Sequence, residues 1–220
     1  MSAELVGVIW VSLKVATVAT LAILVPGVWL GHALARRRVP ARVLVQTLVT
    51  LPLVLPPVAV GLLLLRLLSP LSWPGTWLAE VGPWLLTWKA AALAAATMSF
   101  PLLVRGAEAG FSSVSERTEA VALGLGLSRA RVFWKVTLPL ARAGILSGVL
   151  LAFARALGEF GATILVAGHI SGETETLALG IYARIEAGDS DAAWALVGAS
   201  MIIALLLGLL AERARMRSRA

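Results

Sequence analysis

Long runs of apolar residues dominate the chain, and the polar residues gather between them. The runs cover residues of about 5–34, 43–68, 84–104, 143–167 and 192–211. Each run is about as long as the roughly 20 residues that a helix needs to cross a bilayer. Helices are expected for all five, because lipid leaves the open edge of a strand without hydrogen-bond partners. The pattern therefore predicts an all-α, polytopic membrane protein in which residues 1–220 form a single transmembrane domain.

The first apolar run could also be a cleaved secretory signal, since residues 33–35 resemble a cleavage site. Such signals carry positive charge before an apolar core of about 7–15 residues. Here Glu4 precedes the run, the run is longer, and Arg36, Arg37 and Arg38 follow it. We therefore expect this run to be a retained span.

The composition supports a membrane protein. Of the 220 residues, 59% are hydrophobic and 14% are charged, whereas soluble domains average roughly 45–50% and 25%. The mean hydropathy is +0.90. A soluble protein of this size cannot bury so much apolar surface, and disordered chains are poor in apolar residues. Five spans leave no room for a soluble catalytic domain, and the absence of cysteine excludes disulfides and thiol chemistry.

The basic residues predict how the spans are oriented. Of the 19 Lys and Arg residues, 14 lie in the segments 36–42, 105–142 and 213–219, which alternate with acidic segments. Basic residues favour the cytoplasmic side of a membrane. We therefore expect the N-terminus outside and the C-terminus inside. The same bias accounts for most of the net charge of +7, so the charge implies no nucleic-acid partner.

The predicted cytoplasmic loop, residues 105–142, is longer than a link between two spans needs to be. Ser113 followed by Glu116 is a capping-box pattern, which predicts a helix over residues 114–125. Taken alone, this helix could equally lie flat on the lipid surface as an amphipathic segment.

A second short helix is expected after the first. Ser128 can cap a helix over residues 129–137, and we expect Pro139 to end it. Between the two helices, Gly124 and Gly126 both tolerate a sharp turn, and the sequence leaves open which of them makes it.

The same segment carries a recognisable motif. Glu119-Ala120-Val121-Ala122, then Gly126, then Leu138-Pro139, resembles the EAA loop of ABC-importer permeases. In that family the loop forms a coupling helix that docks into a groove on the ATPase subunit. The resemblance thus assigns ATPase coupling to Glu119, Ala120, Leu123, Gly124, Gly126, Leu138 and Pro139.

Three further stretches resemble signatures of molybdate permeases. They are LPLVLPPVAVG at residues 51–61, RALGEFGAT at 155–163 and GETETL at 172–177. Together with the loop, the resemblance runs from about residue 44 to residue 182. Sulfate permeases share a close variant of the Gly-Glu-Phe-Gly stretch. Molybdate is therefore the expected substrate, with tungstate and sulfate or thiosulfate as alternatives.

The resemblance implies an architecture and a set of partners. The chain would have the type I ABC-importer fold and form a homodimer in the inner membrane of a prokaryote. Each dimer would bind two ATPase subunits on the cytoplasmic side and an extracytoplasmic oxyanion-binding protein. No cofactor is expected on this chain. It has no Gly-x-x-x-x-Gly-Lys-Ser/Thr sequence, so ATP and Mg would be bound by the partner ATPase.

Two features within the spans are candidates for a pathway or gate. The prolines of the second span remove helix hydrogen bonds and predict a kinked or broken helix, which either lines the pathway or is a static kink. Glu159 is an acid well inside a predicted span, and Arg155 lies one turn before it. The two are expected to pair, either to neutralise each other or to act as a gate element. The full candidate set is Pro52, Pro56, Pro57, Arg155, Gly158, Glu159, Gly161 and Thr163.

Functions of other classes are less well supported. A stand-alone secondary transporter or channel would usually show internal repeats and polar residues along several spans. A membrane enzyme would need acids, bases or metal ligands that converge. His32 and His169 lie at span ends on opposite sides, so no metal site is expected. Two small-residue pairs, Gly27 with Gly31 and Gly144 with Gly148, predict close helix packing within the subunit.

Overall fold

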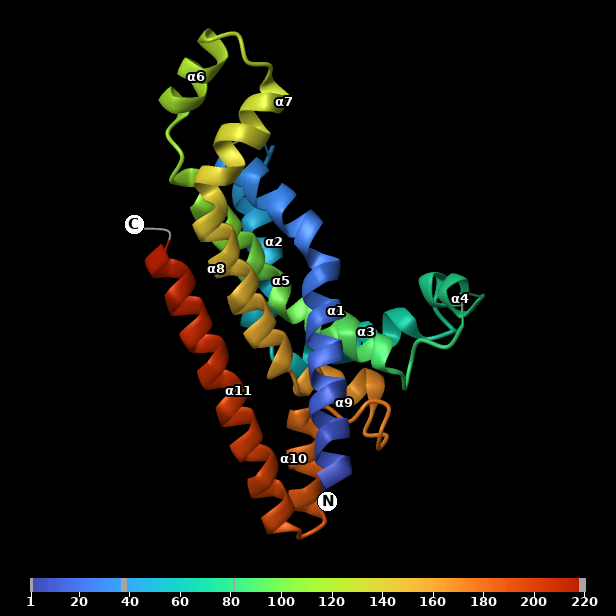
Figure 1. The fold of residues 1–220 in the computed structure, drawn as a ribbon. Coiled ribbons are helices and arrows are strands. Elements are labelled where there is room, and N and C mark those ends of the chain that lie inside the picture. Colours follow the sequence, from blue (N-terminus) through green and yellow to red (C-terminus); the bar gives the residue numbers. More distant parts are fainter. Residues whose placement is uncertain (1, 37–38, 81, 218–220) are drawn as a thin grey trace.

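The computed structural model describes residues 2–36, 39–80 and 82–217, and within them it is built of helices joined by loops (Figure 1). The all-α expectation is therefore confirmed. Arg37 and Arg38, which entered the charge argument, lie outside the described residues. The helices, in chain order, are α1 (Ser2–Ala35), α2 (Arg42–Val54), α3 (Pro57–Leu68), α4 (Trp73–Glu80), α5 (Trp88–Ser112), α6 (Glu116–Gly124), α7 (Arg129–Val132), the π-helical turn η1 (Phe133–Thr137), α8 (Leu138–Leu157), α9 (Gly161–Ala167), α10 (Leu177–Glu186) and α11 (Ser190–Arg217).

Among the described residues, four helical stretches are long and apolar enough to cross a membrane. They are Glu4–Ala35, Trp88–Ser112, Arg129–Leu157 and Ser190–Leu209. The pair α2 and α3 is a fifth candidate, bent by 106° at its break. The predicted number of five spans is reached when this bent pair is taken as one broken span. The prolines thus break the second predicted span, 43–68, rather than merely bending it.

The third predicted span has the wrong boundaries. It was expected at residues 84–104, but α5 begins at Trp88 and continues to Ser112. The helix therefore takes up the first part of the loop predicted at 105–142. The helix continues because Ala107 and Phe111 are fully buried, which extends its packed face beyond the apolar run that ends at Val104.

The fourth predicted span, residues 143–167, is not one helix. Its helical part starts earlier, since the chain is helical from Arg129 to Leu157. It then breaks and resumes as α9 at Gly161. The helix α8 ends at Gly158, where the backbone leaves helical geometry with φ −93° and ψ 14°.

The helix α5 forms the centre of the subunit, packed against α1 on one side and α8 on another. Its buried face is made mainly of alanine, with Ala90, Ala91, Ala94 and Ala95 fully covered. Side chains this small let the neighbouring helix backbones approach closely, as in other helix contacts within membranes.

Glycines extend this close packing toward the end that carries α6. Gly106 and Gly110 of α5 face Gly148 and Gly144 of α8. A Cβ at Gly148 would lie 3.0 Å from the Cα of Gly106, so the two backbones nearly touch. On α1, a Cβ at Gly31 would lie 2.6 Å from that of Ala107. Both glycine pairs therefore pack within the subunit, as predicted.

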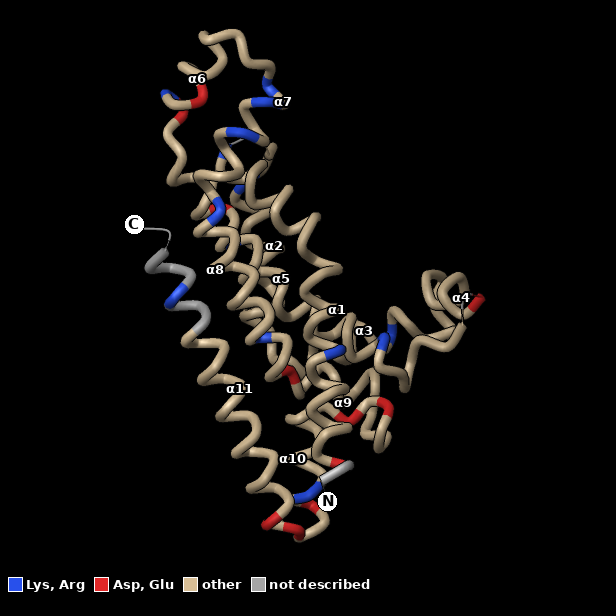
Figure 2. Tube along the Cα trace, viewed as in Figure 1, with Lys and Arg blue, Asp and Glu red and all other residues tan. Residues whose placement is uncertain are grey.

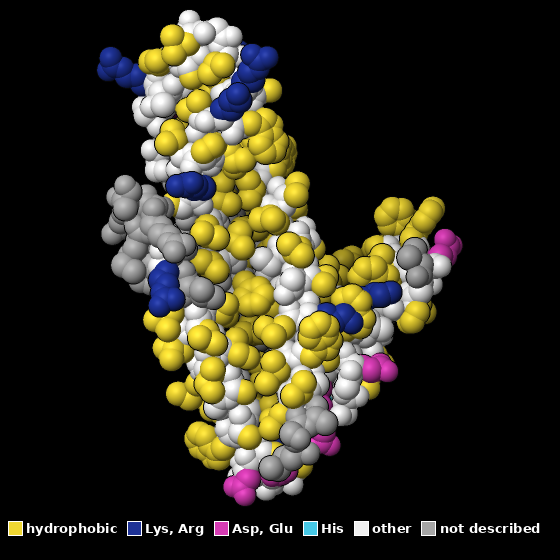
Figure 3. Space-filling view, viewed as in Figure 1, with side chains coloured by type: hydrophobic (Ala, Val, Ile, Leu, Met, Phe, Trp, Pro, Cys, Tyr) yellow, Lys and Arg dark blue, Asp and Glu magenta, His cyan; other side chains and the backbone are white. Residues whose placement is uncertain are grey.

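Charged residues are unevenly distributed between the two ends of the molecule, with both signs present at each end. Lys and Arg are prominent around α6 and α7, whereas Asp and Glu gather near α10 and the N-terminus (Figure 2). Hydrophobic side chains cover the middle of the face shown in Figure 3. On α11, large apolar side chains are exposed in the single chain, including Ile202, Leu205 and Leu206. This surface is suited to lipid or to another membrane helix.

Candidate functional site

The helix α6 projects beyond the bundle at one end of the molecule (Figure 1). It begins at Glu116, two residues later than predicted, and its cap is Ser115, whose hydroxyl accepts the N–H of Arg117. The predicted cap, Ser113, instead donates its hydroxyl to the carbonyl of Gly110 at the end of α5. The capping-box assignment was wrong because α5 extends as far as Ser112.

The turn after α6 is made by Gly126. This residue has φ +84°, a left-handed conformation that glycine adopts without steric cost. Its N–H donates to the carbonyl of Leu123 at 3.0 Å, and Leu127 N–H donates to that of Ala122 at 3.3 Å. Gly124 is still within the helix. The question that the sequence left open is therefore decided in favour of Gly126.

The exposed surface of α6 and its turn carries a group of apolar side chains beside the polar residues of its first turn. Val121, Leu123 and Leu125 are 57%, 42% and 79% exposed. Ala120 is exposed as well, while Ala122 is buried. Exposed apolar side chains on a projecting helix favour contact with another protein surface.

Glu119 faces the opposite way, into its own chain. Its carboxylate Oε1 is paired with the guanidinium of Arg36 and accepts the hydroxyl of Thr137 at 2.6 Å. Burial alone would raise the pKa of Glu119, but the Thr137 and Arg36 contacts outweigh it and hold the pKa below its usual range. Glu119 is therefore an anionic anchor for α6, and it is not part of the exposed surface.

The second half of the motif lies on a continuous helix. Pro139 does not end a helix, contrary to the prediction, because the chain stays helical from Arg129 to Leu157 and Pro139 follows directly on a π-helical turn. The preceding turn, η1, is π-helical and absorbs the change in hydrogen bonding. Leu138 packs against the cluster of Phe111 and Ala141. Leu138 and Pro139 thus join the projecting loop to a spanning helix.

The proline break of the second span lies between α2 and α3. Pro52 is inside α2, Pro56 is extended with ψ 133°, and Pro57 opens α3 at its first turn. The break of the fourth span lies against it, because a Cβ at Gly161 would come 2.8 Å from the Cβ of Pro57. Gly61 likewise lies against Ala162 of α9. The two interrupted segments therefore meet at Pro57 and Gly161, whereas Pro52 lines the hollow between α1, α2 and α5.

The ion pair predicted between Arg155 and Glu159 is present. Arg155 Nη1 lies 2.6 Å from Glu159 Oε2, and Glu159 is 2% exposed. Its second oxygen, Oε1, accepts the N–H of Ala162 at 2.8 Å, which caps α9. Thr163 is also buried, and its hydroxyl has no hydrogen-bond partner among the described residues. Glu159 therefore holds the break between α8 and α9 in place.

Sequence reasoning missed a second buried acid. Glu108 of α5 is 8% exposed and accepts bonds from Arg42 and Gln46 of α2, both at 2.8 Å, and from Arg105 at 3.2 Å. It was missed because the apolar run ends at Val104, which placed Glu108 in a loop. The available signal was the spacing of Arg42 and Gln46, which lie one helical turn apart and can therefore donate to the same acid.

A third buried acid, Glu175, lies in the segment that resembles the family's outer loop. It pairs with Arg184, and His169 Nε2 lies 3.5 Å from the same oxygen. Burial would raise the pKa of Glu175, but Arg184, followed by His169, holds it below its usual range. The contacts tie residues 168–176 to α10.

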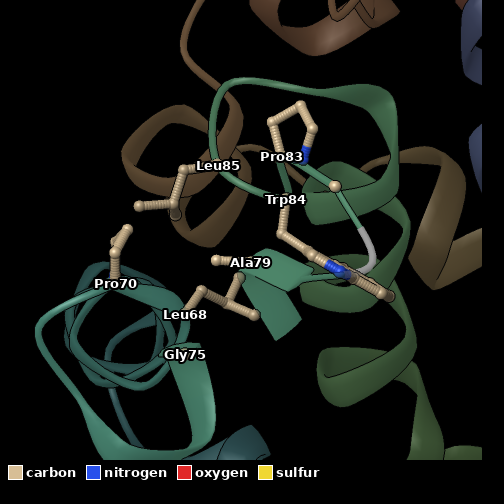
Figure 4. Close-up of a pocket in the computed structure, with 8 residues that line it drawn as sticks. Leu68, Pro70, Gly75, Ala79, Pro83, Trp84 and Leu85 are labelled. Carbon is tan, nitrogen blue, oxygen red and sulfur yellow. The ribbon is translucent and has the colours of Figure 1, made fainter. Parts of the chain in front are cut away.

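Two hollows in the described part of the molecule have apolar linings. One lies beside α3 and α4 and is lined by Leu68, Pro70, Gly75, Ala79, Gly82, Pro83, Trp84 and Leu85 (Figure 4). The other, of about 410 Å³, is open and lies between α1, α2 and α5. Neither lining offers a cation for an oxyanion. Within the described residues, no three His, Cys, Asp or Glu side chains are grouped as a metal site.

Comparison with known proteins places this geometry in a family. Residues 23–216 match the family model described as binding-protein-dependent transport system inner membrane component. The molybdenum transport system permease protein ModB of Escherichia coli (strain K12) is 43% identical over 189 residues, covering 83% of this chain and 81% of that protein. The sulfate transport system permease protein CysT of the same strain is 37% identical over 182 residues, covering 82% and 66%.

A solved structure shares the fold. It is described as inward facing conformations of the MetNI methionine ABC transporter, and it aligns with a TM-score of 0.79 at 17% identity, over 99% of this chain and 97% of that one. At this identity the likeness concerns the fold, which is that of an ABC-importer permease. The chain thus belongs to the family of inner membrane components of binding-protein-dependent transport systems.

Proposed function

We propose that this chain is the permease subunit of an ATP-driven importer for molybdate. Two copies would form the translocation pathway, each docking one ATPase subunit through α6, and a binding protein would deliver the anion from outside. The observation that carries this proposal is the exposed apolar group of Val121 and Leu123 on α6 and Leu125 just after it. Glu119 of the same helix is turned inward.

Two observations of sequence similarity favour molybdate over sulfate. The signatures at residues 51–61, 155–163 and 172–177 resemble those of molybdate permeases. The identity to the E. coli molybdenum permease also exceeds that to the sulfate permease from the same organism. Tungstate has the same charge and shape, and discrimination between these anions would rest on the binding protein.

The proposed orientation has the N-terminus outside and the C-terminus inside. The support is the concentration of basic residues near α6 and α7, opposite the acidic end near α10. Because the chain has no cysteine, a single introduced cysteine is the only thiol that a maleimide can label, and its labelling reports the side of the membrane on which it lies. Ser128→Cys is expected to react with an impermeant maleimide only in inside-out vesicles, and Ser171→Cys only in right-side-out cells. The reverse pattern would overturn the orientation.

The function is tested by reconstitution with the candidate ATPase in liposomes. Leu125→Arg is expected to weaken ATPase association, because it places a charge in the apolar contact. Leu71→Arg, at a 97% exposed apolar residue between α3 and α4, is the matched control and should leave association unchanged. Hydrolysis should rise with molybdate-loaded binding protein and not with the sulfate-loaded form.

The other outcomes are informative in different ways. Stimulation by sulfate alone would retain the class of transporter and overturn the substrate. If the wild-type chain failed to associate with the ATPase, the docking assignment of α6 would be wrong. A secondary transporter would then become the better hypothesis.

A further inference from the structure

We infer that Arg36 is a positioning residue that transmits movement of α6 to the spanning helix α1. The inference rests on the proposed function, since it assumes that α6 is the part of the chain the ATPase moves. The resemblance that identified Glu119 said nothing about a partner for it within the chain. The structure supplies that partner from a segment 83 residues earlier.

Arg36 joins three parts of the chain at one point. It directly follows α1, and its Nη2 pairs with Glu119 of α6. Its Nη1 donates to the carbonyls of Phe111, at 3.2 Å, and Val114, at 3.3 Å, where α5 ends. The Phe111 carbonyl also accepts the N–H of Val114 at 3.2 Å. A cation beside the last carbonyls of a helix is favoured by the helix dipole. Arg36 therefore connects α1, α5 and α6 through one guanidinium.

The junction is sheltered from solvent. The side chain of Arg36 is 7% exposed and that of Glu119 is 19% exposed. The third member, Thr137, is 2% exposed and lies on η1, just before α8. Nearby, His32 makes edge contacts with the rings of Phe111 and Phe133. A charge pair in such surroundings is stronger than one on the surface, and the loss of one partner leaves the other charge unpaired.

The helix α6 has little else to hold it. Ala122 is its only buried residue in the described structure, and its apolar side chains point outward. Because α6 has so few packing contacts, a displacement of this helix would reach the rest of the chain mainly through the residues that attach it. Glu119, through its contacts with Arg36 and Thr137, is such a residue, and it lies between α1 and the entry to α8.

The helix α1 then extends the connection across the molecule. With a rise of about 1.5 Å per residue, its 34 residues span about 50 Å. About a third of the way along α1 from its other end, the hydroxyl of Ser12 accepts the N–H of Leu177 at 2.7 Å, where α10 begins. Arg36 and Ser12 thus place α1 in contact with both the coupling loop and the start of α10.

The test compares Arg36→Met, Glu119→Gln and the double variant, reconstituted with the ATPase and the loaded binding protein. Uptake per ATP hydrolysed is expected to fall about tenfold in each single variant, as for the loss of a buried charged contact. The double variant should be no worse than either single one, because both remove the same link. Arg36→Lys, which keeps the charge, should recover part of the coupling.

Arg129→Ala is the matched control, because Arg129 is an exposed arginine on α7, outside the docking helix α6. It should couple as the wild type does. If Arg36→Met took up as much anion per ATP as the wild type, the assignment of Arg36 would be wrong. Additive losses in the double variant would also overturn it.

A second measurement needs no ATPase. In the purified chain alone, hydrogen exchange of residues 116–124 should become faster in Arg36→Met and stay unchanged in Arg129→Ala. Unchanged exchange in Arg36→Met would overturn the attachment itself. Failure of the wild-type chain to bind the ATPase, with faster exchange in Arg36→Met, would instead contradict the proposed function and leave the attachment standing.

Discussion

Arg155 Nη1 lies 2.6 Å from Glu159 Oε2, across the point where the fourth span breaks. The other oxygen of Glu159 caps α9 by accepting the N–H of Ala162. One carboxylate thus neutralises a cation on α8 and satisfies a free amide of the next helix. The pair has a definite structural role, and any gating role would have to exchange both contacts together.

We predict that Arg155→Met destabilises the protein by about 3 kcal/mol, because it leaves Glu159 buried and unpaired. The double variant Arg155→Met with Glu159→Gln should recover much of this loss, since a neutral amide can still accept from Ala162. Thermal unfolding in detergent measures both. If the double variant were less stable than Arg155→Met, the unpaired charge would not be the cause.

We predict that Glu108 fixes α2 against α5. None of the residues of α2 is buried in the single chain, so its polar bonds from Arg42 and Gln46 to Glu108 carry much of the attachment. Glu108→Ala should increase hydrogen exchange in residues 42–54 while leaving most of α5 protected. Glu116→Ala, at an exposed acid, serves as the control. Equal protection of α2 in both variants would contradict this role.

The glycine contact between α5 and α8 gives a steric prediction. A Cβ at Gly110 would lie 2.6 Å from the carbonyl oxygen of Ala141, so Gly110→Val should abolish the yield of folded protein. Gly7→Ala is the control, because Gly7 of α1 has nothing within 4 Å of an added Cβ. That change should be neutral, or stabilising by up to about 1 kcal/mol from helix propensity. Yield and melting temperature after size-exclusion chromatography distinguish the two.

The segment 168–176 should respond to acid through Glu175. Its pKa in the folded protein is lowered, because the pairing with Arg184 and His169 outweighs burial. The carboxylate therefore contributes stability above its unfolded pKa of about 4.3, and this is lost as pH falls through the folded pKa. Glu175→Gln should be less stable than wild type at pH 7, and the difference should shrink below about pH 4.

The control for this pH dependence is Glu173→Gln, two residues away. Glu173 is exposed, so its removal should change the melting temperature little at any pH. A constant difference between Glu175→Gln and wild type from pH 7 to pH 3 would show that the ionised carboxylate is not what stabilises the segment.

The apolar runs alone were enough to predict a helical membrane protein with about five spans, because a bilayer leaves few other ways to satisfy the backbone. The motifs around Glu119, Pro56 and Glu159 likewise predicted the family, and the i,i+4 spacing predicted the ion pair of Arg155. These features are local, so adjacent residues are sufficient to reveal them.

Tertiary structure decided how distant segments meet. The contacts of Arg36 with Glu119 and of Arg42 with Glu108 join residues separated by 83 and 66 positions, and no local pattern encodes them. The extension of α5 to Ser112, the choice of Ser115 as the cap and the meeting of Gly161 with Pro57 also depend on packing. The length of the apolar runs determined which segments are predicted to span the membrane, whereas the burial of charges and the close approach of helices depended on which neighbours the fold provides.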